Sequence, residues 1–129
     1  MAPRDRKLKI VIVGVCTSGK TSVCNTLKEL GYDAYTVAQE HSSVPHMWRL
    51  RNPDVVVYLY CDLETVRKRR AVYWGRKLFE TQLHRLSDAR KHSHVFIDTT
   101  ELQVEDTVQK VLQAIEEGRG FDDHERCDS

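Results

Sequence analysis

Four apolar runs along the chain have the composition of β-strands. The runs 8–13 and 54–60 consist largely of apolar, often β-branched residues, which is typical of strands buried on both faces of a sheet. Shorter runs at 33–38 and 95–97 give a weaker strand signal. We therefore predict four strands, with a loop at 40–51 that contains at most one helical turn.

Helical periodicity separates these runs. The segment 19–30 places three apolar residues on one stripe of a helix: Val23, Leu27 and Leu30. The charged stretch 63–91 is predicted to be one long helix with a bend at Gly75. A last helix at 104–117 places five apolar residues on one face: Val104, Val108, Val111, Leu112 and Ile115.

The alternation of strands and helices predicts an α/β fold. We expect a three-layer α/β/α arrangement, in which helices cover both faces of a short, mostly parallel sheet of about four to five strands. The sequence shows no internal repeat and no long linker, so we expect one domain over residues 1–118 and an acidic tail at 119–129.

Ligands of such folds bind beyond the carboxyl ends of the parallel strands. The candidate segments are therefore those that follow the predicted strands: 14–21, 39–43, 61–62 and 98–100. Asp54 lies at the opposite end of its strand, so we expect it to have a structural role.

Composition excludes several classes of protein. The 129 residues are 40% hydrophobic and carry a formal net charge of +1, which argues against intrinsic disorder and against nucleic-acid binding driven by bulk charge. No apolar stretch approaches the length of a membrane span, and the polar N-terminus does not resemble a signal peptide. The four cysteines form no CxxC pair, so we expect reduced thiols and a cytoplasmic protein.

The strongest motif lies between the first strand and the first helix. Gly14-Val-Cys-Thr-Ser-Gly19-Lys20-Thr21 matches G-x-x-x-x-G-K-[ST], the pattern of a phosphate-binding loop. In such a loop, backbone N–H groups and a helix N-terminus face a phosphate, the lysine reaches the β- and γ-phosphates, and the hydroxyl of Thr21 ligates Mg²⁺. We predict that eight residues contact a triphosphate: Gly14, Cys16, Thr17, Ser18, Gly19, Lys20, Thr21 and Ser22.

With this motif the sequence resembles the P-loop NTPases, and within them the small nucleoside and nucleotide kinases. Softer similarities lie at 27–32 with Glu40, at 53–60 with 64–69, and at 94–100 with 104–115. The DxxG and N-K-x-D motifs of GTPases, the LSGGQ-type signature of transporter ATPases and the protein-kinase motifs are absent from the sequence. The resemblance implies that the chain binds ATP with Mg²⁺.

Charge is segregated along the chain. In the segment 62–92, nine Lys and Arg residues face four Asp and Glu residues, a local charge of +5, which suggests a basic lid over the phosphates. The candidate phosphate contacts are Arg69, Arg70 and Arg76; by resemblance, Arg69 occupies the place of an arginine in the lid-entry helix of such kinases. The alternatives are a solvated helix face or a nucleic-acid patch with Tyr73 and Trp74 as stacking platforms.

Two acids follow strands at the ligand end of the sheet. Glu40 is a candidate to face the phosphate acceptor, where similar kinases place an acidic residue, and Asp62 is a candidate to orient Mg²⁺. Surface solvation or helix capping is the alternative for both. His41 and Trp48 line an acceptor pocket or belong to ordinary loop packing, and Cys16 is an oxidation-sensitive thiol or packs beneath the loop.

These observations predict an ATP-binding, Mg²⁺-dependent, kinase-like protein that transfers the γ-phosphate to a small hydroxyl or phosphate acceptor. The stretch between Lys20 and Pro53 is too short to hold an acceptor-binding insert, and the usual acid after a third strand is not evident. The alternative is therefore a nucleotide-binding or sensing module with little or no transfer. We expect no membrane partner, and nucleic acid is disfavoured.

Overall fold

The computed structural model describes residues 8–15, 18–70 and 75–117. Cys16, Thr17, Tyr73, Trp74 and the acidic tail lie outside the described residues. In chain order the elements are β1 (Lys9–Gly14), α2 (Lys20–Glu29), β2 (Asp33–Thr36), η1 (Gln39–His41), η2 (Met47–Arg49), β3 (Val55–Tyr60), α3 (Leu63–Arg70), α4 (Arg76–Arg85), α5 (Ser87–Lys91), β4 (Val95–Asp98) and α6 (Val104–Glu117).

The four strands form one parallel sheet in the order β2-β1-β3-β4. Strand β1 is central, with Ile12 beside Thr36 of β2 and Gly14 beside Leu59 of β3. The prediction of an α/β fold with a short parallel sheet is confirmed. Because β1 and β2 are neighbours, the segments that leave their carboxyl ends start side by side.

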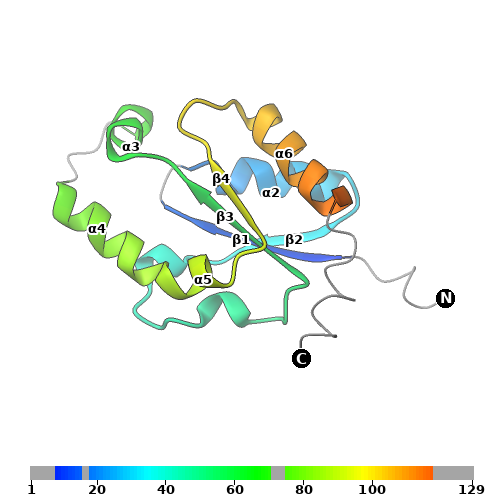
Figure 1. Ribbon diagram of the computed structural model, residues 1–129, viewed down its shortest axis with the longest axis horizontal. Helices are drawn as coiled ribbons and strands as arrows, with labels where there is room; N and C mark the ends of the chain where they lie inside the picture. Colours follow the sequence, from blue (N-terminus) through cyan, green and yellow to red (C-terminus); the bar gives the residue numbers. More distant parts are fainter. Residues whose placement is uncertain (1–7, 16–17, 71–74, 118–129) are drawn as a thin grey trace.

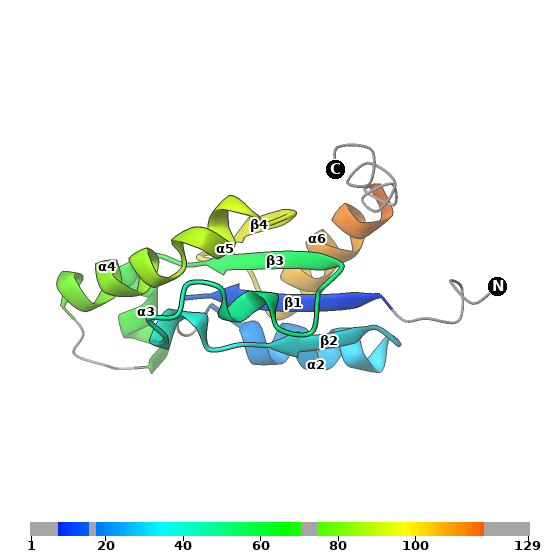
Figure 2. The same ribbon diagram turned by 90° about the horizontal axis from the view of Figure 1, so that it is seen from below.

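Helices cover both faces of the sheet, as predicted (Figures 1 and 2). Ile10 and Ile12 of β1 belong to the apolar cluster that α2 and α6 complete on one face. Val11 and Val13 belong to the cluster on the other face, where α4 and α5 contribute. These β1 side chains are fully buried, and each stabilises the fold by roughly 1.5–3 kcal/mol relative to an exposed position.

The prediction of one continuous helix over 63–91 is wrong. The structure has three helices there, and α4 and α5 meet at the fully buried Leu86, whose backbone ends one helix and begins the next. Leu30 was expected on the buried stripe of α2, but it follows the last residue of that helix and is 55% exposed. The loop at 40–51 contains two short 3-10 turns rather than one turn.

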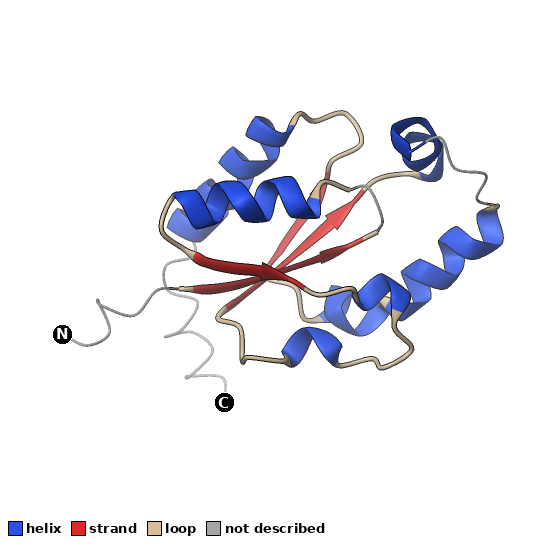
Figure 3. Ribbon diagram, turned by 180° about the vertical axis from the view of Figure 1, so that it is seen from behind, coloured by secondary structure: helices blue, strands red, loops and turns tan. Residues whose placement is uncertain are grey.

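The arrowheads of the strands point toward α3, which lies at the carboxyl end of the sheet (Figures 1 and 3). Asp54 lies at the other end, where one carboxylate oxygen accepts a hydrogen bond from the backbone N–H of Lys9 at 2.9 Å. None of the helices in the described ranges has both the length and the apolar composition that a membrane crossing requires.

Candidate functional site

The loop after β1 is shaped by its two glycines. A Cβ atom on Gly14 would collide with the carbonyl oxygen of Leu59 in the adjacent strand β3, so no larger residue fits there. Gly19, which precedes α2, has the left-handed backbone conformation (φ 100°, ψ 14°) that glycine adopts without steric cost. Between them, the N–H of Ser18 donates to the carbonyl of Val15 at 3.2 Å and folds the loop back on itself.

The start of α2 is open to an anion. No side-chain cap hydrogen bond to its N-terminal N–H groups is seen among the described residues, and its first turn contains no acidic residue. These N–H groups and the positive end of the helix dipole favour a negatively charged ligand. Thr21 and Ser22 are exposed in this first turn.

Lys20 reaches back over the loop that precedes it. Its Nζ donates to the carbonyl of Gly14 at 2.9 Å, to the carbonyl of Val15 at 3.3 Å and to Glu40 Oε2 at 2.8 Å. The side chains of Lys20 and Glu40 are only 12% and 5% exposed. Two residues that were predicted separately therefore form one buried ion pair at the loop.

Glu40 is held at this position by the segment that follows β2. Gln39 is fully buried and closes the segment, because its amide group donates to the carbonyl of Val44 at 2.6 Å and accepts from the N–H of Trp48 at 2.9 Å. The other carboxylate oxygen of Glu40, Oε1, is buried and has no hydrogen-bond partner among the described residues. Glu40 thus presents an unsatisfied acceptor atom beside the cation.

Asp62 has a different role from Glu40. Its Oδ1 accepts a hydrogen bond from the N–H of Thr65 at 2.8 Å, which is the geometry of a helix N-cap for α3. Hydrogen bonds from Thr65 hold the pKa of the Asp62 carboxyl below its ordinary value. The capping alternative considered for Asp62 thus describes what the carboxylate does in this structure.

The predicted arginines take different positions. Arg69 Nη2 donates to the backbone carbonyl of Thr99 at 2.8 Å, and Arg69 lines a pocket with Ser18 and Gly19 of the loop. Arg70 ends α3, and its side chain lies outside the described residues. Arg76 begins α4 and is exposed. Burial raises the pKa of the Tyr60 hydroxyl, and the charge of Arg76 opposes this rise.

The site also includes Arg85, which was not predicted from the sequence, and Thr99, which lies in the candidate segment 98–100 but was given no role of its own. Arg85 of α4 is half-buried, and its Nη1 lies 3.4 Å from the backbone carbonyl of Glu40, which brings a second cation to the buried ion pair. Thr99, after β4, donates through its hydroxyl to the carbonyl of Ser18 at 3.0 Å. Neither residue belongs to a motif, so only the tertiary fold brings them to the site.

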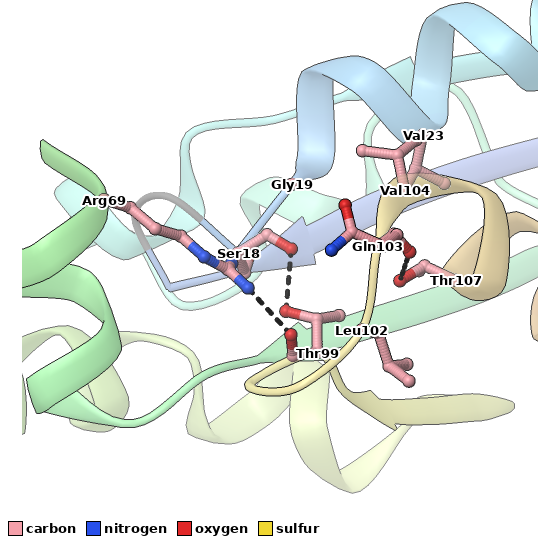
Figure 4. A pocket seen from close by; sticks show the side chains of 9 residues that line it. All are labelled: Ser18, Gly19, Val23, Arg69, Thr99, Leu102, Gln103, Val104 and Thr107. Carbon is pink, nitrogen blue, oxygen red and sulfur yellow. Dashed lines mark hydrogen bonds between the residues drawn. The ribbon is translucent and has the colours of Figure 1, made fainter.

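A pocket of about 290 Å³ adjoins the loop (Figure 4). Side chains of α2, α3 and the start of α6 converge on it, with apolar contributions from Val23, Leu102 and Val104. Its polar lining includes Arg69 and the amide of Gln103. A planar group with polar edges suits such a lining.

Trp48 belongs to packing rather than to a pocket. It is 6% exposed, its indole N–H donates to Asp88 Oδ2 at 2.8 Å, and its ring stacks on His92 at 5.3 Å between centroids. His46 also contacts Asp88, at 3.2 Å. Burial raises the pKa of Asp88, but hydrogen bonds from Trp48 and His46 and the charge of His92 outweigh it and lower the pKa. This cluster fastens the segment that carries Glu40 to α5.

The metal-binding capacity of the described ranges is limited. They contain no group of three or more His, Cys, Asp and Glu side chains that would hold a metal ion without other ligands. Thr21 and Glu40 offer hard oxygen donors, and the unpartnered Oε1 of Glu40 fits a cation or a metal-bound water. Mg²⁺ usually takes one or two protein oxygens together with water and substrate phosphates, so a hydroxyl and a carboxylate are donor types that it accepts.

Comparison of the sequence with protein-family models and with curated proteins found no match in either case.

Proposed function

We propose that this protein is a P-loop, kinase-like protein that binds ATP and Mg²⁺ at the loop between β1 and α2. The observation that carries the proposal is the contact of Lys20 with Glu40. The Lys20 side chain, which is 12% exposed, already holds one anionic group at 2.8 Å at the N-terminus of α2, and it does so beside two carbonyls of a glycine-bounded loop. A phosphate oxygen would meet the same cation and the same helix end.

The pocket next to the loop supports a nucleoside triphosphate rather than a free phosphate. It shares Ser18 and Gly19 with the loop, so a ligand that fills both would place phosphates and a planar base in continuous contact. The amide of Gln103 offers one donor and one acceptor group to a base. The preference for ATP over GTP rests on the resemblance to small kinases and on the absence of an N-K-x-D motif.

Thr21 and Glu40 are the residues that would hold Mg²⁺. The ion would neutralise charge on the phosphate oxygens and orient the triphosphate. Lys20 would contribute its charge to the β- and γ-phosphates after release from Glu40, and the freed carboxylate would then face the metal or the acceptor. Asp62 is not needed for this role, because it caps α3.

For the reaction, we propose transfer of the γ-phosphate to a small hydroxyl or phosphate acceptor. Lys20 contacts the carboxylate of Glu40 and Arg85 its backbone carbonyl, so two cations meet one acid here, and positive charge of this kind would stabilise a developing phosphoryl charge. Arg69, Arg70 and Arg76 are proposed to add positive charge from α3 and α4. Glu40 would accept or orient the proton of a hydroxyl acceptor.

A second candidate function is a module that binds ATP without efficient transfer. It is favoured by the use of Asp62 as a helix cap, which leaves Glu40 as the one acid contacting Lys20 in the described ranges. If Glu40 serves the metal, no described carboxylate at this contact is left to activate an acceptor.

We place the protein in the cytoplasm, where ATP is abundant and free thiols persist. The described cysteines, Cys24 and Cys61, are buried and form no disulfide with each other. The proposed partners are a nucleoside triphosphate and a small-molecule acceptor.

Calorimetric titration of the full chain tests ligand binding. ATP and GTP are each titrated with Mg²⁺ and with EDTA into wild type, Lys20→Ala and the matched control Lys28→Ala, which changes an exposed lysine near the other end of α2. We expect MgATP to bind wild type and Lys28→Ala equally. Lys20→Ala is expected to bind about 30-fold more weakly, because a charge-assisted contact of about 2 kcal/mol is lost. Equal binding by Lys20→Ala would refute the site assignment.

Loss of the γ-phosphate separates the two candidate functions. Wild-type protein is incubated with γ-labelled ATP and a panel of nucleosides and small hydroxyl metabolites. Transfer of label to one acceptor supports the kinase, whereas intact ATP bound in the presence of every acceptor supports the binding module.

A further inference from the structure

We infer that Thr99 is a positioning residue for the phosphate loop: its hydroxyl fixes the direction of the Gly19 N–H group. Thr99 lies after β4 and is 2% exposed, and its Oγ1 lies 3.0 Å from the carbonyl oxygen of Ser18, the residue before Gly19. The inference rests on the proposed function, because it concerns how that loop presents N–H groups to a phosphate.

The single hydroxyl proton of Thr99 has two carbonyl acceptors within reach. Oγ1 lies 3.0 Å from the Ser18 carbonyl and 3.2 Å from the Tyr60 carbonyl. The Tyr60 carbonyl already accepts the backbone N–H of Thr99 at 2.6 Å. A hydroxyl donates only one hydrogen bond. We expect the Thr99 hydroxyl to donate to the Ser18 carbonyl, because that contact is shorter and the Tyr60 carbonyl already accepts the N–H of Thr99.

A bond to the Ser18 carbonyl determines where the next N–H points. The C=O and N–H groups of a planar trans peptide point in opposite directions, so a carbonyl held toward Thr99 directs the Gly19 N–H away from it. Gly19 has few steric restraints of its own and adopts a left-handed conformation. An external tether is therefore needed to keep this peptide plane from rotating.

The side chain of Ser18 does not provide that tether. Ser18 is 1% exposed, and its hydroxyl oxygen is buried and has no hydrogen-bond partner among the described residues. The backbone N–H of Ser18 bonds to Val15, which fixes the preceding peptide plane and not the following one. The plane between Ser18 and Gly19 is thus tied by Thr99.

Thr99 is itself held firmly enough to act as an anchor. Its carbonyl accepts Arg69 Nη2 at 2.8 Å (Figure 4). The same carbonyl accepts the N–H of Leu102 at 3.1 Å, and the N–H of Thr99 is bound to the carbonyl of Tyr60 in β3. One residue therefore joins α3, β3 and the phosphate loop. We assign the Gly19 N–H to the group of amides that faces the phosphate, with its direction set by Thr99.

The test compares Thr99→Val, which removes the hydroxyl at nearly constant shape, with Thr99→Ser, which keeps it. Thr81→Val is the matched control: the Thr81 hydroxyl also donates to a backbone carbonyl, that of Lys77 at 2.9 Å, but Thr81 lies in α4 and does not line the pocket. MgATP affinity is measured by calorimetry, and the Gly19 amide is followed in ¹⁵N-edited spectra with and without MgATP.

We expect Thr99→Val to bind MgATP about tenfold more weakly, as the loss of one well-placed hydrogen bond implies, and to shift the Gly19 amide resonance in the free protein. Thr99→Ser and Thr81→Val should stay within about twofold of wild type. A Thr99→Val variant with wild-type affinity, or a Thr81→Val variant that is weakened as much, would overturn the inference.

Failure of the proposed function gives a different result. If wild type itself does not bind MgATP, the proposed function is refuted, and the orienting role is decided by the spectra of the free proteins. An unchanged Gly19 amide resonance in Thr99→Val would then overturn the orienting role of Thr99. A resonance that is shifted in Thr99→Val and has the wild-type position in Thr99→Ser would support that role. If Thr99→Val does not fold, a Thr99→Ser variant with an altered Gly19 amide and tenfold weaker binding overturns the inference.

Discussion

The buried pair of Lys20 and Glu40 allows a quantitative prediction about stability. Lys20→Met removes the cation and leaves the Glu40 carboxylate, 5% exposed, with Oε1 still unpartnered. Removal of one partner of a buried ion pair costs about 3–5 kcal/mol, because the remaining charge is buried without compensation. We expect the lower end, about 3 kcal/mol, since His41 Nε2 lies 3.6 Å from Glu40 Oε2 and offers a partial replacement.

The assay is urea unfolding of wild type, Lys20→Met, Glu40→Gln and the double variant Lys20→Met/Glu40→Gln. For a domain of this size, about 3 kcal/mol corresponds to a fall of about 10 °C in melting temperature. The double variant should recover most of the loss, because it leaves no unpaired buried charge. A cost below about 1 kcal/mol for Lys20→Met, or a double variant as unstable as the single one, would refute the buried-pair reasoning.

Three further predictions concern the loop, the helix cap and the pH dependence of stability. Gly14→Ala should destabilise the fold and weaken MgATP binding, because its Cβ would collide with the β3 carbonyl of Leu59; a melting temperature and an affinity equal to wild type would contradict this. Asp62→Ala should lower the free energy of unfolding by about 1 kcal/mol and leave MgATP affinity unchanged, since the side chain caps α3; a large loss of affinity would instead indicate a role at the site. Because the pKa of Asp88 is lowered in the folded state, its carboxylate stabilises the fold above the unfolded pKa, near 4, and this contribution is lost as pH falls through the lower folded pKa. Urea unfolding between about pH 2 and 5 should show a stability difference between wild type and Asp88→Asn that shrinks with falling pH. A constant difference would contradict the assignment.

The turn from β1 into α2 and the α/β fold were predictable because their signals are local. The β-branched run before Gly14 favours a strand, and the glycine spacing up to Lys20 fits only a tight turn into a helix. The place of Glu40 after β2 could also be predicted as part of the ligand end of the sheet, because the carboxyl ends of parallel strands share one edge. The contact of Glu40 with Lys20 could not be predicted, because it depends on β2 lying directly beside β1.

Other features could not be predicted because tertiary packing decides them. The break between α4 and α5 falls at Leu86, where neither glycine nor proline signals an end, and burial of that side chain against the sheet accompanies it. Thr99 is an ordinary threonine in the sequence, and it becomes a neighbour of Ser18 only when β4 joins β3. Arg85 likewise reaches Glu40 because α4 packs on η1.

The measurement that tests the central claim most directly is MgATP binding by the double variant Lys20→Met/Glu40→Gln. This variant removes the proposed phosphate cation without leaving a buried unpaired charge, so a loss of binding would not reflect unfolding. We expect wild type to bind MgATP and the folded double variant to bind it at least about 30-fold more weakly. A folded double variant with the affinity of wild type would contradict the claim that Lys20 lies at the nucleotide site.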